Sequence, residues 1–278
     1  MPSQSKAASF RIHCICLVKN EADIIQHCLS CAAKWADYVY VYDGDSTDGT
    51  WDLVLNMASR QIIPFRRDGK VFAEGLRAEV FANYRHLSAD GYWWCQLNAD
   101  EFYVDDPRTL LSEIAAPYHF VWGVPIEYYL TPRDVEELDF GVRMEHLLTR
   151  IRHYRIFHSE PRFFRYRSRL DWNEADAWPS HVGLTYSKRI LFKHYPFRSP
   201  QQIQMRLDVR RENRAKGFPG WEHAKELDWK EKLVDPETTT YDDGVSGYSI
   251  DDQALPCHMD AMPRVIIKQI MHRLRIWP

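Results

Sequence analysis

The chain has 278 residues, which is enough for one large domain or for a domain with an appendage. Hydrophobic residues make up 45% and charged residues 27%, a globular composition that excludes disordered, collagen-like and coiled-coil chains. Because 36 Lys and Arg stand against 39 Asp and Glu, the formal charge is −3, and no basic footprint for nucleic acid is expected. The sequence has no run of about 18 apolar residues and no apolar signal-peptide core, which predicts a cytoplasmic protein.

Apolar runs of strand length alternate with helical patterns over the first hundred residues. Strands are expected at residues 12–18, 38–42, 62–65 and 92–97. Helices are expected between them, the first capped by Asn20 with Ile24, Ile25, Cys28, Leu29 and Ala32 on one face, then at residues 47–58 and 72–87. Four such βα steps predict a sheet wrapped by crossover helices, with ligands bound beyond the carboxyl ends of the strands.

The pattern is less regular further along the chain. A capped helix is expected from Asp106-Pro107, and strands at residues 119–130, 162–166 and 190–195 complete a mixed sheet. Ser199-Pro200 begins a helix that Gly217 closes, residues 217–263 are rich in turn formers, and a helix is expected at residues 264–277. The predicted fold is α/β with a Rossmann-like mixed sheet. The predicted domains are residues 1–198, divided at 105/106, and a helical, loop-rich extension or lid at residues 199–278.

The first chemical motif is an acidic, glycine-containing loop, residues 43–50, between a buried strand and a helix. Asp43 stands at the strand end, where its carboxylate could accept hydrogen bonds from a base N–H or a ribose hydroxyl. Glycines let the backbone approach a ligand closely. The alternative is that Asp45, Ser46, Thr47 and Asp48 only cap the next helix.

The second motif follows the strand at residues 92–97. That strand delivers Asn98, Asp100 and Glu101 at its carboxyl end. Oxygen ligands gathered at a strand end suit Mg²⁺ or Mn²⁺, which would bridge a diphosphate and neutralise the departing nucleoside diphosphate. The alternative, a solvated acidic turn, is disfavoured by the two tryptophans that precede it.

These segments carry a resemblance. Leu17-Val18-Lys19-Asn20-Glu21, then residues 43–50, then Asn98-Ala99-Asp100-Glu101-Phe102 resemble the family 2 glycosyltransferases of the GT-A fold. The resemblance covers roughly the first 105 residues. It implies that Val18, Asn20 and Glu21 lie near the nucleotide base, that Asp43 binds base or ribose, and that Asp100 coordinates the metal. It also favours a uridine donor.

The chain departs from the family pattern at two positions. Gly44 and Asp45 have exchanged places relative to the family loop. The role of Asp45 as a nucleotide ligand therefore does not carry over directly from the family. Asn98 stands where the family has the first Asp of its Asp-x-Asp motif. An amide can still hydrogen-bond a ribose hydroxyl or offer a neutral oxygen to a metal, but it removes one charge.

Further candidates lie outside the three motifs. Arg77, on the helix before the second motif, could pair with the diphosphate, or it could belong to an ordinary solvated helix face. The resemblance implies a histidine that completes the metal shell, and His194 is favoured over His181 because it ends a clear apolar strand. Arg198, just after it, and Glu101 are candidate contacts to phosphate or acceptor.

An inverting transferase needs a carboxylate to take the proton from the acceptor hydroxyl. An acidic cluster, Asp171, Glu174 and Asp176, lies between the strand of the second motif and His194. This is the order that the resemblance to metal-dependent inverting enzymes implies, and the sequence does not choose among the three. Trp172 and Trp178 could form a platform for a sugar ring. The alternative is a solvated loop without a chemical function.

The predicted function is a metal-assisted, inverting glycosyltransferase that moves a sugar from a nucleoside-diphosphate donor to a glycan or lipid-linked acceptor. The alternatives are a non-catalytic nucleotide-sugar binding protein, suggested by Asn98, and a nucleotidyltransferase, ranked lower because residues 18–22 contain no glycine-rich phosphate loop. Cys28 and Cys31 lack a second pair and are interpreted as small buried residues rather than zinc ligands. The helix at residues 264–277 could lie peripherally on an anionic membrane, although packing on the domain is slightly favoured.

Overall fold

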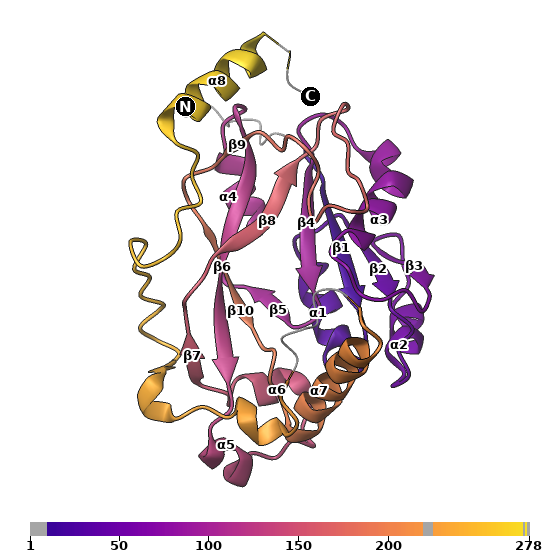
Figure 1. Ribbon diagram of the computed structural model, residues 1–278, viewed down its shortest axis with the longest axis vertical. Helices are drawn as coiled ribbons and strands as arrows, with labels where there is room; N and C mark the ends of the chain where they lie inside the picture. The colour runs from indigo at the N-terminus through magenta and orange to yellow at the C-terminus, as the bar shows by residue number, and fades with distance from the viewer. Residues whose placement is uncertain (1–9, 219–224, 275, 277–278) are drawn as a thin grey trace, which may run out of the picture. The chain divides into compact units, whose positions relative to one another are not determined.

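The structure is a computed structural model that describes residues 10–218, 225–274 and 276. It divides the chain into two compact units that interleave along the sequence. Unit 1 comprises Met1–Val124, Ser159–Phe192 and Pro256–Pro278, and unit 2 comprises Pro125–His158 and Lys193–Leu255. The expected division into domains at residue 198 stays a prediction. The elements are shown in chain order by colour in Figure 1.

Four parallel strands form one half of the unit 1 sheet. They are β1 (Ile12–Val18), β2 (Tyr38–Asp43), β3 (Ile62–Arg67) and β4 (Trp93–Asn98), in the spatial order β3-β2-β1-β4. The register pairs Val18 with Asp43, Asp43 with Arg67, and Leu17 with Asn98. The carboxyl ends of all four strands therefore meet at one edge of the sheet.

The other half of this sheet is mostly antiparallel. β8 (Glu160–Arg165) runs antiparallel to β4, and the first part of β6 (Tyr118–Tyr129) runs antiparallel to β8. Two short strands complete it, β5 (Glu101–Tyr103), which pairs with β10 (Ile190–His194), and β9 (Leu184–Thr185), which pairs parallel with β6. The expected mixed sheet is confirmed.

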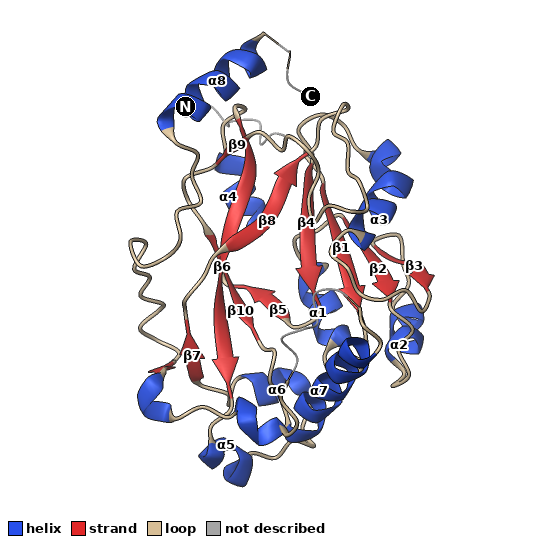
Figure 2. Ribbon diagram, viewed as in Figure 1, coloured by secondary structure: helices blue, strands red, loops and turns tan. Residues whose placement is uncertain are grey.

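Helices α1 (Ile25–Ala32), α2 (Thr50–Asn56) and α3 (Leu76–Tyr84) are the crossovers between the parallel strands, and a 3-10 turn (Arg85–Leu87) extends α3 (Figure 2). The remaining helices of unit 1 are α4 (Pro107–Glu113) and α8 (Met262–Arg273). Asp106 caps α4 as expected, since its side chain accepts the Arg108 N–H.

Two expectations for helix starts are wrong. Asn20 does not cap α1, because Ile24 occupies the N-cap position and the Asn20 side chain instead accepts the Thr47 N–H. Helix α2 begins at Thr50 rather than at residue 47. The residue before it, Gly49, has a φ of 94°, a left-handed conformation that favours glycine and ends the loop.

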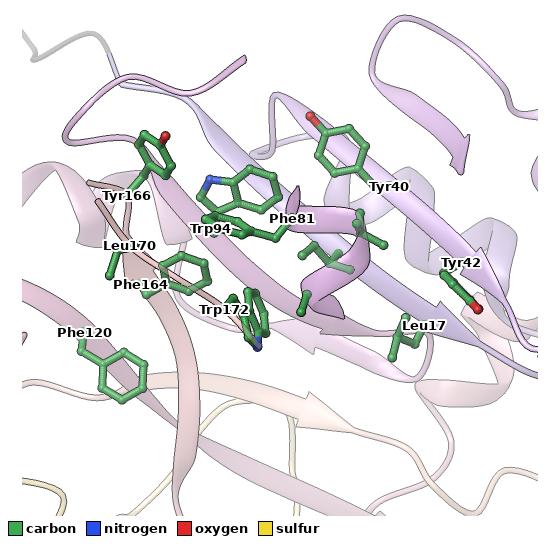
Figure 3. Packing of buried hydrophobic residues seen from close by; sticks show 13 residues of the cluster. Leu17, Tyr40, Tyr42, Phe81, Trp94, Phe120, Phe164, Tyr166, Leu170 and Trp172 are labelled. Carbon is green, nitrogen blue, oxygen red and sulfur yellow. The ribbon is translucent and has the colours of Figure 1, made fainter. Parts of the chain in front are cut away.

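Aromatic side chains dominate the core of unit 1 (Figure 3). Trp94 of β4 is fully buried, with the Phe81 ring of α3 at 4.9 Å and the His13 ring of β1 stacked at 4.7 Å. Burial lowers the pKa of His13 to about 4, so this imidazole is neutral in the core at pH 7. Many of the aromatic side chains of the sequence therefore pack in the core of unit 1.

Unit 2 is built on the second part of β6. β7 (His153–Arg155) pairs antiparallel with it, and β11 (Thr240–Tyr241) pairs with β7. Its helices are α5 (Pro132–Glu137), α6 (Met144–Leu148), α7 (Pro200–Ala215) and two 3-10 turns (Trp229–Lys232 and Pro236–Thr238). Ser199 caps α7 by accepting the Gln202 N–H, as expected.

The extended segment after β11 is fixed to β6 by hydrogen bonds between half-buried polar side chains and the buried Tyr128. The hydroxyl groups of Tyr128 and Tyr248 lie 2.7 Å apart, and both donate to the carboxylate of Asp242. The Lys193 Nζ lies 3.4 Å from the same carboxylate. The described part of residues 217–263 is loop-rich, as expected. Within it, the segment that carries Asp242 and Tyr248 is held in place by these hydrogen bonds.

The predicted α/β fold, with a Rossmann-like mixed sheet flanked by helices, is confirmed by this arrangement. Its parallel half places the ends of β1, β2 and β4 at the edge where the sequence motifs occur.

Candidate functional site

Two loops at the carboxyl edge of the parallel strands are joined by side-chain hydrogen bonds. The backbone N–H groups of Asn20, Glu21 and Ala22, which follow β1, donate to the side chains of Ser46, Thr50 and Asp48 at 2.8, 2.9 and 3.0 Å. In return, the Asn20 side chain accepts the Thr47 N–H at 2.9 Å. The polar residues of the 43–50 loop therefore fix the two loops to each other, rather than only capping α2.

Asp43 ends β2 with a side chain that is fully buried. Its Oδ1 accepts the Ser46 N–H at 2.6 Å, but its Oδ2 is buried without a hydrogen-bond partner among the described residues. Burial raises the pKa of this carboxyl, and the hydrogen bonds from Ser46 oppose the rise only in part. A buried carboxylate oxygen without a donor is costly, so a ligand that supplies an N–H or O–H group would be stabilised here.

Strained backbone occurs on both sides of Asp43. Asn20 and Asp45 have φ values of 56° and 61°, in the left-handed region that non-glycine residues seldom adopt. Such strain often gathers at ligand sites, where the surrounding structure maintains it. Arg67, at the end of β3, holds Asp45 through a 3.1 Å bond to Oδ1, and the Lys19 Nζ donates to the Gly44 carbonyl at 2.8 Å.

Asn98 ends β4 in a chain of directed hydrogen bonds. Its Oδ1 accepts from Arg77 at 2.9 Å, and its Nδ2 donates to the Glu101 Oε1 at 2.7 Å. Arg162 of β8 clamps the same Glu101 carboxylate with two bonds of 2.7 and 2.9 Å. An amide suits position 98 because it accepts from a guanidinium and donates to a carboxylate at the same time.

Arg77 of α3 is not on a solvated helix face. Its side chain is buried, and it pairs with Glu74 as well as with Asn98. Its Nε is buried without a partner among the described residues. The guanidinium thus points at the end of β4, and the expected contact to a diphosphate stays a prediction.

Asp100 and Glu101 are both buried just after β4. Each offers a carboxylate oxygen, and these two oxygens lie within 4.8 Å of each other, close enough to share a metal ion. Of the two histidine candidates, His181 lies in unit 1; its side chain is exposed, and its φ is 57°. Within the part of the chain that the structure describes, His181 belongs to no cluster of three or more metal-binding side chains.

The acidic loop at residues 171–178 is anchored next to the same elements. Gln96 of β4 donates to the Ala177 carbonyl at 2.9 Å, and a Cβ at Gly75, where α3 begins, would lie 1.8 Å from the Glu174 carbonyl oxygen. Only glycine permits this close approach. Within unit 1, the structure therefore brings the candidate bases, Asp171, Glu174 and Asp176, to the elements that carry Arg77 and Asn98, and all three are exposed.

The two tryptophans of this loop differ. Trp172 is a core residue that packs on Phe81 and Phe164, and its Nε1 donates to the Asp176 carbonyl. Trp178 is half-buried and stacks against Trp172 at 6.3 Å. Because Trp172 is enclosed, any sugar platform in this loop falls to Trp178.

His194 lies in unit 2, where its Nδ1 is 3.5 Å from the Oε1 of Glu127 on β6. Burial alone would raise the pKa of Glu127, but the neighbouring His194 and a hydrogen bond from Tyr129 hold it below its ordinary value. A carboxylate close to the imidazole is typical of metal-ligating histidines. This pairing supports the choice of His194 over His181 as a ligand.

The Glu127–His194 pair lines a pocket of about 600 Å³ within unit 2. Arg155 also lines it, with hydrogen bonds only to the carbonyl and hydroxyl of Thr238. Among the described residues, no carboxylate forms an ion pair with Arg155, although Glu127, its cross-strand neighbour, lines the same pocket. Arg198 is fully buried nearby in the chain and donates to the Tyr195 carbonyl, so its expected phosphate contact stays a prediction.

Sequence reasoning missed Arg162 and Glu127. Glu127 is a charged residue inside the apolar strand Tyr118–Tyr129, and Arg162 directly precedes the apolar pair Phe163-Phe164, and a buried charge at either position requires a partner. That signal could have singled both residues out. The partner of Arg162 is 61 residues away, so pattern alone could not have identified it.

No protein-family model matches the chain, and no curated protein matches it. Among solved structures, it is similar to mannosyl-3-phosphoglycerate synthase from Rubrobacter xylanophilus, with a TM-score of 0.32 and 14% identity over 76% of this chain and 78% of that one. It is also similar to a glucose-1-phosphate thymidylyltransferase from Bacillus anthracis in complex with a sucrose, with a TM-score of 0.31 and 15% identity. That match covers 48% of this chain and 62% of the thymidylyltransferase.

Proposed function

We propose that this chain is a glycosyltransferase that binds a nucleoside-diphosphate sugar at the carboxyl ends of β1, β2 and β4. The observation that carries the proposal is the fully buried Asp43 carboxylate, whose Oδ2 has no donor among the described residues. It stands between two loops that are held rigidly together. Rigid loops around an unsatisfied acceptor are preorganised for a ligand with a matching donor.

The chemistry of Asp43 restricts the ligand. A carboxylate accepts hydrogen bonds from an imide N–H of uracil or thymine, or from a ribose hydroxyl. The pairing edges of adenine and cytosine carry an unprotonated ring nitrogen, which a carboxylate would repel. Guanine also offers N–H donors on its pairing edge, so Asp43 does not select the base by itself. We infer a uridine donor, with Val18, Asn20 and Glu21 beside the base, because the family resemblance implies it.

A divalent cation fits the two carboxylates after β4. Asp100 and Glu101 offer oxygen ligands of the kind Mg²⁺ and Mn²⁺ prefer, although Arg162 and Asn98 share the charge of Glu101. When bound, the cation would neutralise charge on the diphosphate. The expectation that His194 also ligates the cation is kept as a prediction from the sequence, supported by its pairing with Glu127.

In the proposed reaction, one carboxylate of the 171–178 loop takes the proton from an acceptor hydroxyl. The acceptor oxygen then forms a bond to the anomeric carbon, while the bond from that carbon to the diphosphate breaks. The nucleoside diphosphate leaves with the electron pair, and the configuration is inverted. Arg77, buried beside Asn98, is our candidate for holding the diphosphate.

The proposal is tested by titrating the protein with UDP in the presence of Mn²⁺, and by following donor turnover with UDP-sugars. We expect UDP to bind more tightly than ADP, and Asp43→Ala to weaken UDP binding about tenfold to a hundredfold through loss of a charged hydrogen bond. Asp52→Asn, an exposed carboxylate on α2, is the control and should bind normally.

Other outcomes distinguish the alternatives. Binding that depends on Asp43 without donor turnover for any acceptor would indicate a non-catalytic nucleotide-sugar binding protein. Release of pyrophosphate from a nucleoside triphosphate and a sugar phosphate would indicate a nucleotidyltransferase. Unchanged UDP affinity in Asp43→Ala would contradict the proposed site.

A further inference from the structure

Helix α8 faces the protein with its polar side. The Lys268 Nζ donates to the Gly183 carbonyl at 3.1 Å and pairs with Asp260, and the His272 ring lies 4.7 Å from the His119 ring. These contacts fix α8 beside β9, as Figure 1 shows. In a helix on the surface of a water-soluble domain, the apolar side normally faces the core and the polar side faces water.

The apolar side of α8 is exposed as a result. We define the α8 outer face as Met262, Ile266, Ile267, Ile270 and Leu274, whose exposed fractions lie between 50 and 69%. Four of these residues follow one another at intervals of four, so they form one stripe along the helix. The helix buries none of its side chains fully. A contiguous apolar surface of this kind marks an interaction site.

The charges beside the stripe indicate the partner. Residues 262–274 contain three cationic side chains, Arg264, Lys268 and Arg273, and no Asp or Glu. Arg264 and Arg273 are exposed, and at about 100° per residue Arg264 lies about 60° from Ile267 and Arg273 about 60° from Ile270, so each borders the outer face. An apolar stripe bordered by arginines matches a lipid surface, where aliphatic side chains enter the acyl boundary and guanidinium groups bind phosphates.

We propose that the α8 outer face binds an anionic membrane surface, with α8 lying in the plane of the interface. The proposal is independent of the glycosyltransferase activity. Among the described residues, no helix is both long enough and apolar enough to cross a bilayer. Twelve residues of helix span about 18 Å, short of the ~30 Å hydrocarbon core, which agrees with a helix that rests on the surface.

A second copy of this chain fits the surface less well. Two α8 outer faces packed together would bring the bordering arginines of one copy close to those of the other. The helix offers no carboxylate to pair with them. Anionic lipid headgroups supply the missing negative charge, so charge complementarity favours the membrane.

The test is flotation of the full chain with vesicles of phosphatidylcholine alone and of phosphatidylcholine with 30% phosphatidylglycerol. We expect at least tenfold stronger partitioning onto the anionic vesicles, and weaker partitioning at high salt. Ile266→Ser combined with Ile270→Ser, and separately Arg264→Glu combined with Arg273→Glu, should each reduce this partitioning at least tenfold. Because all four side chains are exposed, the variants should keep the wild-type melting temperature.

Matched controls come from exposed residues elsewhere. Val245→Ser removes an 89% exposed side chain, and Arg60→Glu reverses an exposed charge, and both should bind vesicles normally. Equal binding to both vesicle types, or no flotation, would overturn the proposal. A concentration-dependent dimer that the Ile266/Ile270 variant abolishes would overturn it in favour of self-association. None of these flotation or association results would test whether UDP binds at Asp43.

Discussion

Asp43 combines a structural cost with a chemical purpose. Its carboxylate is fully buried, and one oxygen has no hydrogen-bond donor among the described residues. A group held in this way lowers the stability of the unliganded protein when it is ionised. The cost is offset only when a ligand provides a donor, which is the expected behaviour of a binding residue rather than of a structural one.

The pH dependence of stability should reveal this cost. Because burial raises the pKa of Asp43 in the folded protein, its contribution to stability is fully present below the unfolded carboxyl pKa of about 4. It is lost as the pH rises through the folded pKa. Asp43→Asn removes this titration. Relative to wild type, the variant should therefore be more stable at pH 7 than it is at pH 4. Urea denaturation at both pH values measures it.

The same variant should bind UDP less tightly than the wild type, since the amide cannot replace a charged acceptor. A control is Asp52→Asn, whose stability difference should not change between pH 4 and pH 7. If Asp43→Asn behaved like this control, burial would not be raising the pKa of Asp43.

Asn98 shows why a family pattern can change at one position. Its amide donates to Glu101 at 2.7 Å and accepts from Arg77, so a carboxylate there would face the carboxylate of Glu101. Repulsion of two like charges raises the pKa of the pair. The amide is therefore the residue that this arrangement of Glu101 and Arg162 requires.

Asn98→Asp should destabilise the fold by about 1–3 kcal/mol at pH 8, as expected when a buried hydrogen bond is replaced by an unfavourable contact. The raised pKa of the pair means that the loss should be smaller at pH 5 than at pH 8. Thermal unfolding at both pH values tests this. Asn173→Asp on the exposed loop is the matched control. An equal loss at the two pH values would contradict the pairing with Glu101.

Among the elements, the 171–178 loop depends most on its neighbours. Its backbone passes so close to Gly75 that no larger residue fits there, and it is tied to β4 through Gln96. The Trp172 ring is part of the core. The loop therefore presents its acidic side chains from a fixed backbone, which is what a general base requires.

Single neutral substitutions in this loop should separate the base from its neighbours. Among Asp171→Asn, Glu174→Gln and Asp176→Asn, one should lower kcat by about 10²–10⁴ with donor KM nearly unchanged, because general-base catalysis acts in the transition state. Glu136→Gln, exposed on α5, is the control. Steady-state kinetics and the product configuration by NMR decide the outcome. Three near-normal variants, or retained configuration, would show that the base lies elsewhere.

At the scale of the whole molecule, the chain crosses between its two units within single strands. β6 passes from unit 1 to unit 2 after Val124, and β10 does so after Phe192. An apolar pattern predicts such a strand as one piece, and it gives no sign that the two ends belong to different units. The unit boundaries are therefore a property of the contacts, which join segments far apart in the sequence.

The orientation of α8 shows the same limit. The sequence predicts the helix and its apolar side, with Ile266 and Ile270 among the residues of that side. The helix packs on the domain, as expected, but it does so through Lys268 and His272 and leaves its apolar side exposed. Periodicity defines which residues share a face, and only the neighbours decide which way that face turns.

The sequence by itself determined the βα succession, the mixed sheet and the placement of its three motifs at strand ends. These follow from apolar runs, caps and loop residues, which act over a few residues along the chain. The tertiary structure decided that Asp43 has a buried oxygen without a partner among the described residues, that Arg162 clamps Glu101, and that Glu127 lies beside His194. These properties depend on side chains that are brought together from segments tens of residues apart, and local pattern carries no information about such contacts.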